Sequence, residues 1–215
     1  MTQPLKIDFV SDVVCPWCAI GLKSLEQALD RLGDSVAVEM HFQPFELNPQ
    51  MAPEGEDVVE HIARKYGSTP EQIAKNGEAI RQRGAAVGFT FNLDKRNRVV
   101  NTFDAHRLLH WAALEGRQAE LKQALLTAYF TDGRDVSSHD VLVEVAGKVG
   151  LNPVTAREVL ERDRYALDVR AQEQFYQSQG IQAVPSVIVN DRYLIQGGQP
   201  PEAFEETLRR IASEA

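Results

Sequence analysis

Apolar residues alternate with polar or small ones at the two ends of the chain, whereas the middle shows helical spacing. Near the N-terminus, Lys6 to Ser11 and Val36 to Phe42 alternate and predict two strands. Between these strands, apolar residues recur at helical spacing from Trp17 to Leu32, and Gly33 is a usual helix terminator. The first fifty residues therefore predict a strand–helix–strand unit.

The segment from about residue 57 to residue 179 has helical periodicity and no strand character. Thr69-Pro70-Glu71 and Asn152-Pro153 are typical helix starts, and glycines mark several breaks between segments. The pattern predicts helices near 57–66, 70–87, 101–115, 118–130, 138–149, 153–161 and 163–179.

Strand character returns only at Ser186 to Val189 and Tyr193 to Gln196. Asn190-Asp191 between these runs is a two-residue hairpin signal. Pro200-Pro201 then opens a last predicted helix.

The predicted order is β-α-β, a long helical block, and then β-β-α. This order predicts an α/β fold, namely a thioredoxin-like sheet with a large all-helical insertion domain. The helical block is far longer than one crossover needs, so most of it is expected to be inserted. We expect residues 1–50 and 181–215 to form the two parts of the thioredoxin-like domain and residues 51–180 to form the insertion.

Composition excludes several classes of protein. The 215 residues carry a formal net charge of −8 and no basic tract longer than Lys95-Arg96, which argues against nucleic-acid binding. No stretch approaches the ~18 apolar residues of a membrane helix. The run from Leu5 to Val10 is too short for the apolar region of a secretory signal. We therefore expect a cytoplasmic protein with no membrane partner.

The two cysteines frame Cys15-Pro16-Trp17-Cys18 at the start of the first predicted helix. Helix-terminal N–H groups favour negative charge, so we expect the reactive thiolate at Cys15. The three-residue spacing puts Cys18 beside Cys15, where it can resolve a mixed disulfide. Pro16 suits the first helical position, and the Pro16-Trp17 pair is expected to tune the redox poise.

Two other interpretations of the cysteines are a half zinc site and an inert core pair. Structural zinc needs about four ligands, so His41, His61, His106, His110 or His139 would have to complete the site. No zinc-knuckle spacing lies near Cys15. A Cys-x-x-Cys motif near a strand–helix–strand unit in a reducing compartment is typical of redox chemistry. We favour that interpretation and expect no metal.

Val184-Pro185-Ser186 directly precedes a predicted strand, where a proline is acceptable as a plain strand start. The alternative is a cis peptide bond before Pro185. In a thioredoxin sheet this loop faces the cysteine pair. Val184 would then offer its backbone N–H and C=O to a bound peptide or thiol.

Motifs spread in order over essentially the whole chain resemble the FrnE-like subgroup of the DsbA family. They are Asp12 to Gly21, Gln43 to Pro49, Asn101 to Leu108, Val184-Pro185-Ser186 and Gly197 to Pro200. The resemblance implies a thioredoxin fold with a helical insertion, a cis Pro185, a nucleophilic Cys15 and a resolving Cys18.

Relatives in the same family include 2-hydroxychromene-2-carboxylate isomerases and kappa-class glutathione transferases, which bind glutathione and typically have Ser at the position of Cys15. This chain keeps both cysteines, which favours disulfide exchange. The same relatives make a homodimer an expectation.

Asn101 and His106 allow two interpretations. Locally, Asn101 is a preferred helix cap and His106 a solvated or hydrogen-bonded side chain. The resemblance favours a helix packed over the cysteine pair, with both residues at the substrate cleft. His106 and His110 are one turn apart, but no third and fourth metal ligands lie nearby.

The leading hypothesis is a thiol–disulfide oxidoreductase that acts on a protein or a small molecule. It has no tightly bound cofactor, and glutathione is a candidate co-substrate. The alternative is a glutathione-dependent isomerase or transferase for a small aromatic molecule, whose catalysis would survive loss of Cys18. A third hypothesis is a non-catalytic binding module, which stoichiometric zinc would favour.

Overall fold

The computed structural model describes residues 4–214, and its centre is a four-stranded mixed sheet in the order β2-β1-β5-β6. β1 pairs in parallel with β2 and antiparallel with β5, so it is an inner strand. Phe9 lies opposite both Phe42 and Val187 in the register. The strands are β1 (Leu5–Ser11), β2 (Val38–Pro44), β5 (Ser186–Val189) and β6 (Tyr193–Gln196).

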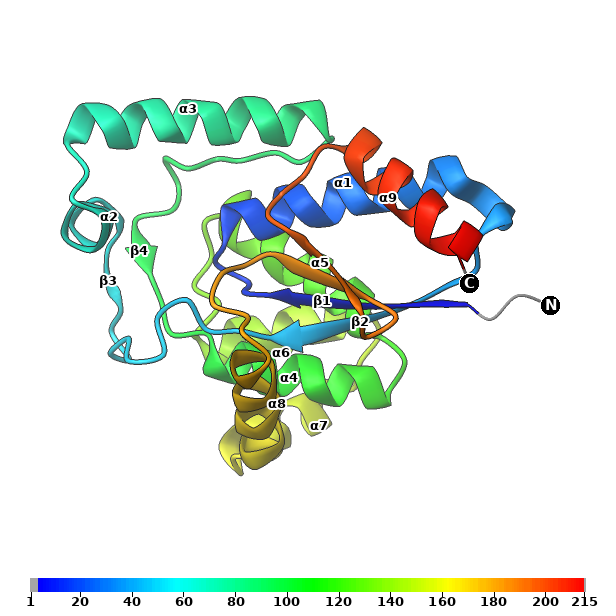
Figure 1. The fold of residues 1–215 in the computed structure, drawn as a ribbon. Helices are drawn as coiled ribbons and strands as arrows, with labels where there is room; N and C mark the ends of the chain where they lie inside the picture. The colour runs from blue at the N-terminus through cyan, green and yellow to red at the C-terminus, as the bar shows by residue number, and fades with distance from the viewer. Residues whose placement is uncertain (1–3, 215) are drawn as a thin grey trace.

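Helices cover both faces of the sheet. α1 (Pro16–Leu32) and α9 (Pro201–Glu214) lie side by side on one face, and α8 (Ala166–Ser178) lies on the other (Figure 1). Cover on both faces explains why almost every residue of β1 is buried. Ile7 and Phe9 belong to the main core cluster, whereas Val10 packs with Tyr176.

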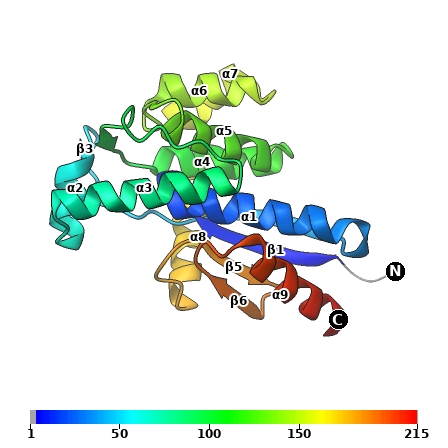
Figure 2. The same ribbon diagram turned by 90° about the horizontal axis from the view of Figure 1, so that it is seen from above.

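Of the remaining helices, α4 to α7 lie on the side of the sheet away from β6, whereas α3 lies along α1 and α2 lies at the far end of α3 (Figure 2). One core cluster contains sheet residues such as Phe9 and helical residues such as Leu108 and Leu125, so the two regions share a core. The helices are α2 (Val58–Tyr66), α3 (Pro70–Ala86), α4 (Phe103–Leu114), α5 (Gln118–Phe130), α6 (His139–Lys148) and α7 (Pro153–Glu161).

Local sequence signals explain several boundaries. Thr69 and Gln72 form a capping box at the start of α3, and the Asn152 side chain accepts two backbone N–H groups at the start of α7. Asn190 and Asp191 have φ values of 52° and 55°, as a type I′ hairpin turn between β5 and β6 requires. The predicted thioredoxin-like fold is confirmed.

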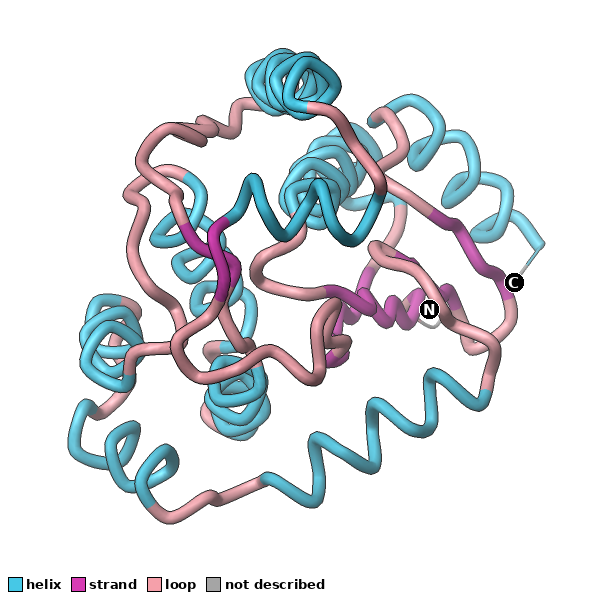
Figure 3. The backbone as a smooth tube through the Cα atoms, turned by 90° about the vertical axis from the view of Figure 1, so that its left-hand side faces the viewer, coloured by secondary structure: helices cyan, strands magenta, loops and turns pink. Residues whose placement is uncertain are grey.

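Two details differ from the sequence pattern. The helix predicted from residue 163 begins only at Ala166, because Asp163 and Tyr165 adopt left-handed φ values of 48° and 62° that a right-handed helix excludes. A small strand pair, β3 (Glu56–Asp57) with β4 (Arg98–Val99), lies apart from the main sheet (Figure 3). Strands of two residues are too short for periodicity to detect.

The segment between β2 and β5 contains all of α2 to α8, and α8 packs on the sheet itself. The division at residues 50 and 180 stays a prediction. Within the part of the chain that the structure describes, no helix is both long and apolar enough to cross a membrane.

Candidate active site

Cys15 follows β1 after a short turn and is the N-cap residue of α1. Its backbone is extended, with φ −94° and ψ 113°, and Pro16 occupies the first turn of the helix. The Sγ of Cys15 accepts a hydrogen bond from the Cys18 N–H at 3.3 Å. The helix start therefore presents a donor to this sulfur, in a position where negative charge is favoured.

Cys18 lies one turn inside α1 and is fully buried, and both cysteines are free thiols. Burial raises the pKa of the Cys18 thiol well above its usual value, and the hydrogen bond and charge of Cys15 raise it further. The charge of Lys122 and the backbone N–H of Asp12 act in the opposite direction. Cys18 therefore holds its proton more tightly than an exposed thiol does.

The loop at Val184 and Pro185 lies against the cysteine pair. The Val184–Pro185 peptide bond is cis, and the Val184 carbonyl oxygen lies 3.8 Å from the Sγ of Cys15. The Pro185 carbonyl accepts a hydrogen bond from the Gly197 N–H at 2.8 Å. This bond ties the loop to the segment that precedes α9.

Two glycines allow these segments to approach one another closely. A Cβ on Gly21 would lie 3.0 Å from the Cγ of Pro185, and a Cβ on Gly198 would lie 3.0 Å from the carbonyl oxygen of Trp17. Both distances are shorter than ordinary van der Waals contact. The missing side chains thus let α1 and the two loops form one compact site.

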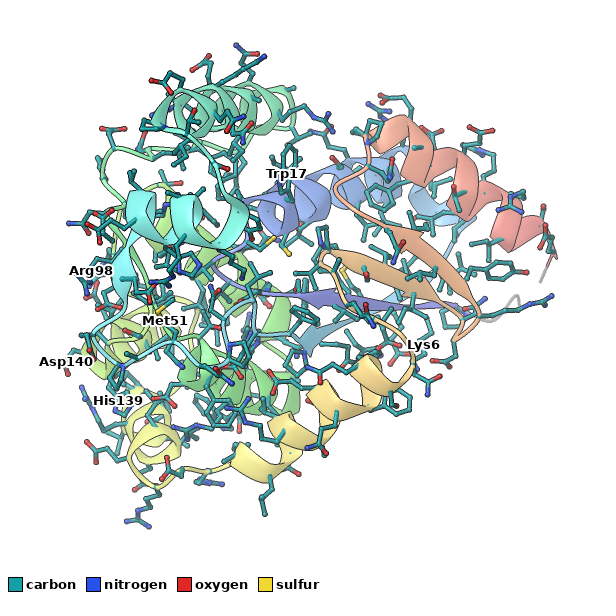
Figure 4. The ribbon with its side chains drawn as sticks, turned by 60° about the vertical axis from the view of Figure 1, so that its left-hand side comes forward. Lys6, Trp17, Met51, Arg98, His139 and Asp140 are labelled. Atoms are coloured by element: carbon teal, nitrogen blue, oxygen red, sulfur yellow. The ribbon has the colours of Figure 1, made fainter. Side chains whose placement is uncertain are left out.

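Trp17 is 39% exposed, even though its spacing matches the apolar stripe of α1. The buried residues of α1 begin at Cys18, so the Trp17 ring stays at the surface beside the cysteines. The Arg83 guanidinium lies 5.8 Å from the ring centroid and donates to the Gly198 carbonyl at 3.1 Å. Figure 4 shows Trp17 on the side of α1 that faces α3, the helix that carries Arg83.

Asp12 is completely buried and accepts hydrogen bonds from the N–H groups of Val13 and Leu47, both at 2.7 Å. Its Oδ1 lies 3.3 Å from the Nε2 of His106, which is also buried. Burial alone would raise the pKa of Asp12, but the hydrogen bond and charge of His106 and the Leu47 N–H lower it below its usual value. Asp12 is therefore an ionised carboxylate in the interior.

Lys122 of α5 adds a buried cation to this region, with 1% of its surface exposed. Burial lowers the pKa of Lys122, while the charges of Cys18, Asp12 and Cys15 act against this effect. The described part of the chain contains no group of three or more His, Cys, Asp or Glu side chains that could hold a metal ion.

A family model of the DSBA-like thioredoxin domain matches residues 6–209. The chain belongs to this family. A probable DsbA oxidoreductase from Streptomyces coelicolor superposes on 98% of the chain with a TM-score of 0.92 and 33% sequence identity, and 91% of that protein is covered. The uncharacterized protein YwbO of Bacillus subtilis is 27% identical over 97% of the chain and 96% of its own length.

A more distantly related protein of known structure has the same fold. The cytosolic disulfide reductase DsbM from Pseudomonas aeruginosa, solved with GSH, has a TM-score of 0.65 at 18% identity, with 95% of this chain and 98% of that chain covered. At this identity the similarity concerns the fold. The predicted DsbA-family resemblance is confirmed, and the assignment to the FrnE-like subgroup stays a prediction.

The DsbA-like fold brings most of the predicted site residues together. Around the Cys15 sulfur lie Cys18, Pro16, Trp17, Val184 and Pro185. His106 is joined to this group through Asp12. Asn101 instead bonds to backbone: its Oδ1 accepts the Phe103 N–H at 2.9 Å and its Nδ2 donates to the Met51 carbonyl at 3.2 Å. A role of Asn101 or His106 in substrate binding stays a prediction.

Sequence patterns did not identify Asp12 or Lys122 as parts of this DsbA-like site. Asp12 stands in the turn before Cys15, where an acidic residue is ordinary. Lys122 lies between Leu121 and Leu125 on a helix, and periodicity alone does not show that a lysine is buried. The sequence feature that could have pointed to Asp12 is its position three residues before Cys15.

Proposed function

We propose that this DsbA-family protein exchanges disulfides with thiol-containing substrates through Cys15 and Cys18. The observation that carries the proposal is the unequal placement of the two sulfurs. Cys15 caps α1 and accepts the Cys18 N–H, whereas Cys18 lies buried behind it and hydrogen-bonds to it. Such a pair divides the reaction, because the outer thiolate attacks and the inner thiol resolves. Family membership supports the same general chemistry.

In the reducing direction, the Cys15 thiolate attacks one sulfur of a substrate disulfide. A bond between Cys15 and that sulfur forms as the substrate disulfide breaks, and the departing sulfur takes up a proton. Cys18 then loses its proton and attacks the Cys15 sulfur, which releases the second substrate thiolate. The protein ends as the Cys15–Cys18 disulfide and the substrate as two thiols. The reverse sequence oxidises a dithiol.

The second step requires a Cys18 thiolate in a buried position. Burial and Cys15 disfavour this thiolate by raising the pKa of Cys18, so other groups must stabilise the negative charge. The ammonium of Lys122 and the backbone N–H of Asp12 both favour the thiolate. We therefore assign Lys122 and Asp12 to the stabilisation of the resolving sulfur.

The proposed substrate, a protein or small molecule with a disulfide or thiol, lies against Val184 and the exposed Trp17. The Val184 carbonyl is 3.8 Å from the attacking sulfur, so an extended substrate would pair with this backbone. We propose glutathione as the reductant, the cytoplasm as the compartment, and no tightly bound cofactor.

The test is to equilibrate the purified protein in buffers of graded glutathione redox ratio, to alkylate free thiols and to count them by mass spectrometry. We expect a reversible two-electron transition between two thiols and one disulfide. Cys15→Ser should abolish the transition, and Cys18→Ser should accumulate a mixed disulfide on Cys15. Wild-type turnover of a disulfide substrate by Cys15→Ser would rule out the proposal.

The same variants separate the rival function, a glutathione-dependent isomerase or transferase for a small aromatic substrate. In that reaction Cys15 positions or activates a thiol and no disulfide forms with Cys18. Catalysis that survives Cys18→Ser, with no two-electron transition in the wild type, would favour the rival.

A further inference from the structure

A partly open cavity of about 200 Å³ lies beside the edge strand β2 and is lined by residues of β2, α4, α5 and α8. Its polar lining includes Lys122 and His106, both buried, and its apolar lining includes Phe42 and Leu109. A cavity needs roughly 10–15 Å³ to hold one water, so this cavity has room for several. A short organic acid is of this size.

The polar side chains that line the cavity are bonded to the protein, with Lys122 as the exception within residues 4–214. His106 is paired with Asp12 and His110 with Gln172, so the histidines of α4 are engaged. The other pairs are Gln118 with the backbone of Phe42, Gln43 with Asp8, and His41 with Glu39. Lys122 is therefore the lining group whose donors remain available.

Lys122 has no ion pair and no hydrogen-bond acceptor among the described residues, although only 1% of it is exposed. The Lys122 Nζ is not one of the fully buried side-chain atoms that lack a partner, so the ammonium reaches the cavity, while burial of the rest of the side chain lowers its pKa. The charges of Cys18, Asp12 and Cys15 favour the ammonium, although none of the hydrogen bonds or ion pairs in the described part of the chain joins them to it. A negatively charged acceptor inside the cavity would stabilise the charged form of Lys122.

The charge and the walls of the cavity specify the ligand. One ammonium balances one negative charge, whereas a phosphate dianion would leave excess negative charge near the buried carboxylate of Asp12. The apolar part of the lining suits a short hydrocarbon portion and is contributed by Phe42, Pro44, Leu109, Ala113 and Leu114.

We propose that this cavity binds a small organic monocarboxylate whose carboxylate group pairs with the Lys122 ammonium. The site is distinct from the substrate surface at Val184 and Trp17, because it opens between β2 and the helices α4, α5 and α8. The proposed binding of a monocarboxylate is the same whether the protein oxidises or reduces its substrate.

Binding is tested by isothermal titration calorimetry of the purified full chain with acetate, butyrate and benzoate, and with inorganic phosphate as the contrasting anion. We expect one equivalent of a monocarboxylate to bind and to raise the melting temperature. Lys122→Met should abolish binding, whereas Lys148→Met, which removes an exposed lysine of α6, should retain it. Absence of binding by all three carboxylates, retention in Lys122→Met, or tighter binding of phosphate would overturn the proposal.

Lys122→Met removes a buried charge and can unfold the protein. A second variant therefore tests the site without changing a charge. Ala113 is exposed on α4 and lines the cavity, and Ala113→Trp should narrow the cavity without changing any charge. We expect a folded protein with weakened binding of benzoate above all. Unchanged benzoate affinity in a folded Ala113→Trp would place the ligand elsewhere and contradict the proposal.

Discussion

The buried carboxyl of Glu46 allows the reasoning about interior charge to be tested quantitatively. Glu46 follows β2, its carboxyl is 1% exposed, and it pairs with Arg170 of α8. Arg170 also donates to Glu173 at 2.7 Å, so two carboxyls share one guanidinium. The second oxygen of each carboxyl is buried and, within the described chain, has no hydrogen-bond partner.

This arrangement raises the pKa of Glu46 from 4.5 to about 7. Burial is the main cause and the charge of Glu173 adds to it, while Arg170 acts against both. Each pKa unit is worth about 1.4 kcal/mol, so the shift corresponds to roughly 3 kcal/mol. Arg170 is partly exposed, so solvent screening reduces this contribution. We expect the stability to change by about 2 kcal/mol as Glu46 titrates.

The direction with pH follows from proton binding. Between about pH 4.5 and pH 7 the folded protein keeps the Glu46 proton that the unfolded chain has lost. The free energy of unfolding should therefore fall as the pH rises through this range. The pKa of Glu173 is also raised, chiefly by burial, so the two groups titrate as a pair and broaden the transition.

Glu46→Gln removes the titrating group and keeps its shape. Urea unfolding at a series of pH values should show a pH dependence flatter by about 2 kcal/mol than that of the wild type. Glu158→Gln changes an exposed carboxyl of α7 and should leave the wild-type dependence intact. A wild-type stability that rises through the range, or an equally steep fall in Glu46→Gln, would refute this account of the buried pair.

Two further predictions concern packing. Gly21→Ala should lower disulfide-exchange activity about tenfold, because the new Cβ would displace Pro185 from the cysteine pair. The control Gly77→Ala should keep the wild-type activity and raise the free energy of unfolding by about 0.5–1 kcal/mol. Equal activity of the two variants by kcat/KM would contradict this. Arg107→Met should lower the free energy of unfolding in urea by about 3–5 kcal/mol, because it leaves Asp104 and buried backbone carbonyls without their donor. The exposed Arg117→Met should cost almost nothing, and a loss under ~1 kcal/mol in Arg107→Met would refute this role of the buried guanidinium. Arg107 donates to the carbonyls of Val159, Leu160 and Arg164.

The order of elements and the position of the cysteine pair could be predicted from the sequence because they rest on local chemistry. Pro16 sets the start of α1 right after Cys15, and alternation identified both strands of the C-terminal hairpin at their observed bounds. The error in the predicted start of the helix at residue 163 also has a local cause. The left-handed backbone of Asp163 and Tyr165 leaves no mark in the spacing of apolar residues.

The polar groups around the sulfurs were decided by the tertiary structure. Asp12 meets His106 across 94 positions of the chain, and Cys15 meets Val184 across 169. Periodicity tells which face of a helix is buried but not what that face meets. The burial of Lys122 depends on how α5 packs against β2, so its charge near Cys18 and the cavity beside it exist only in the folded chain.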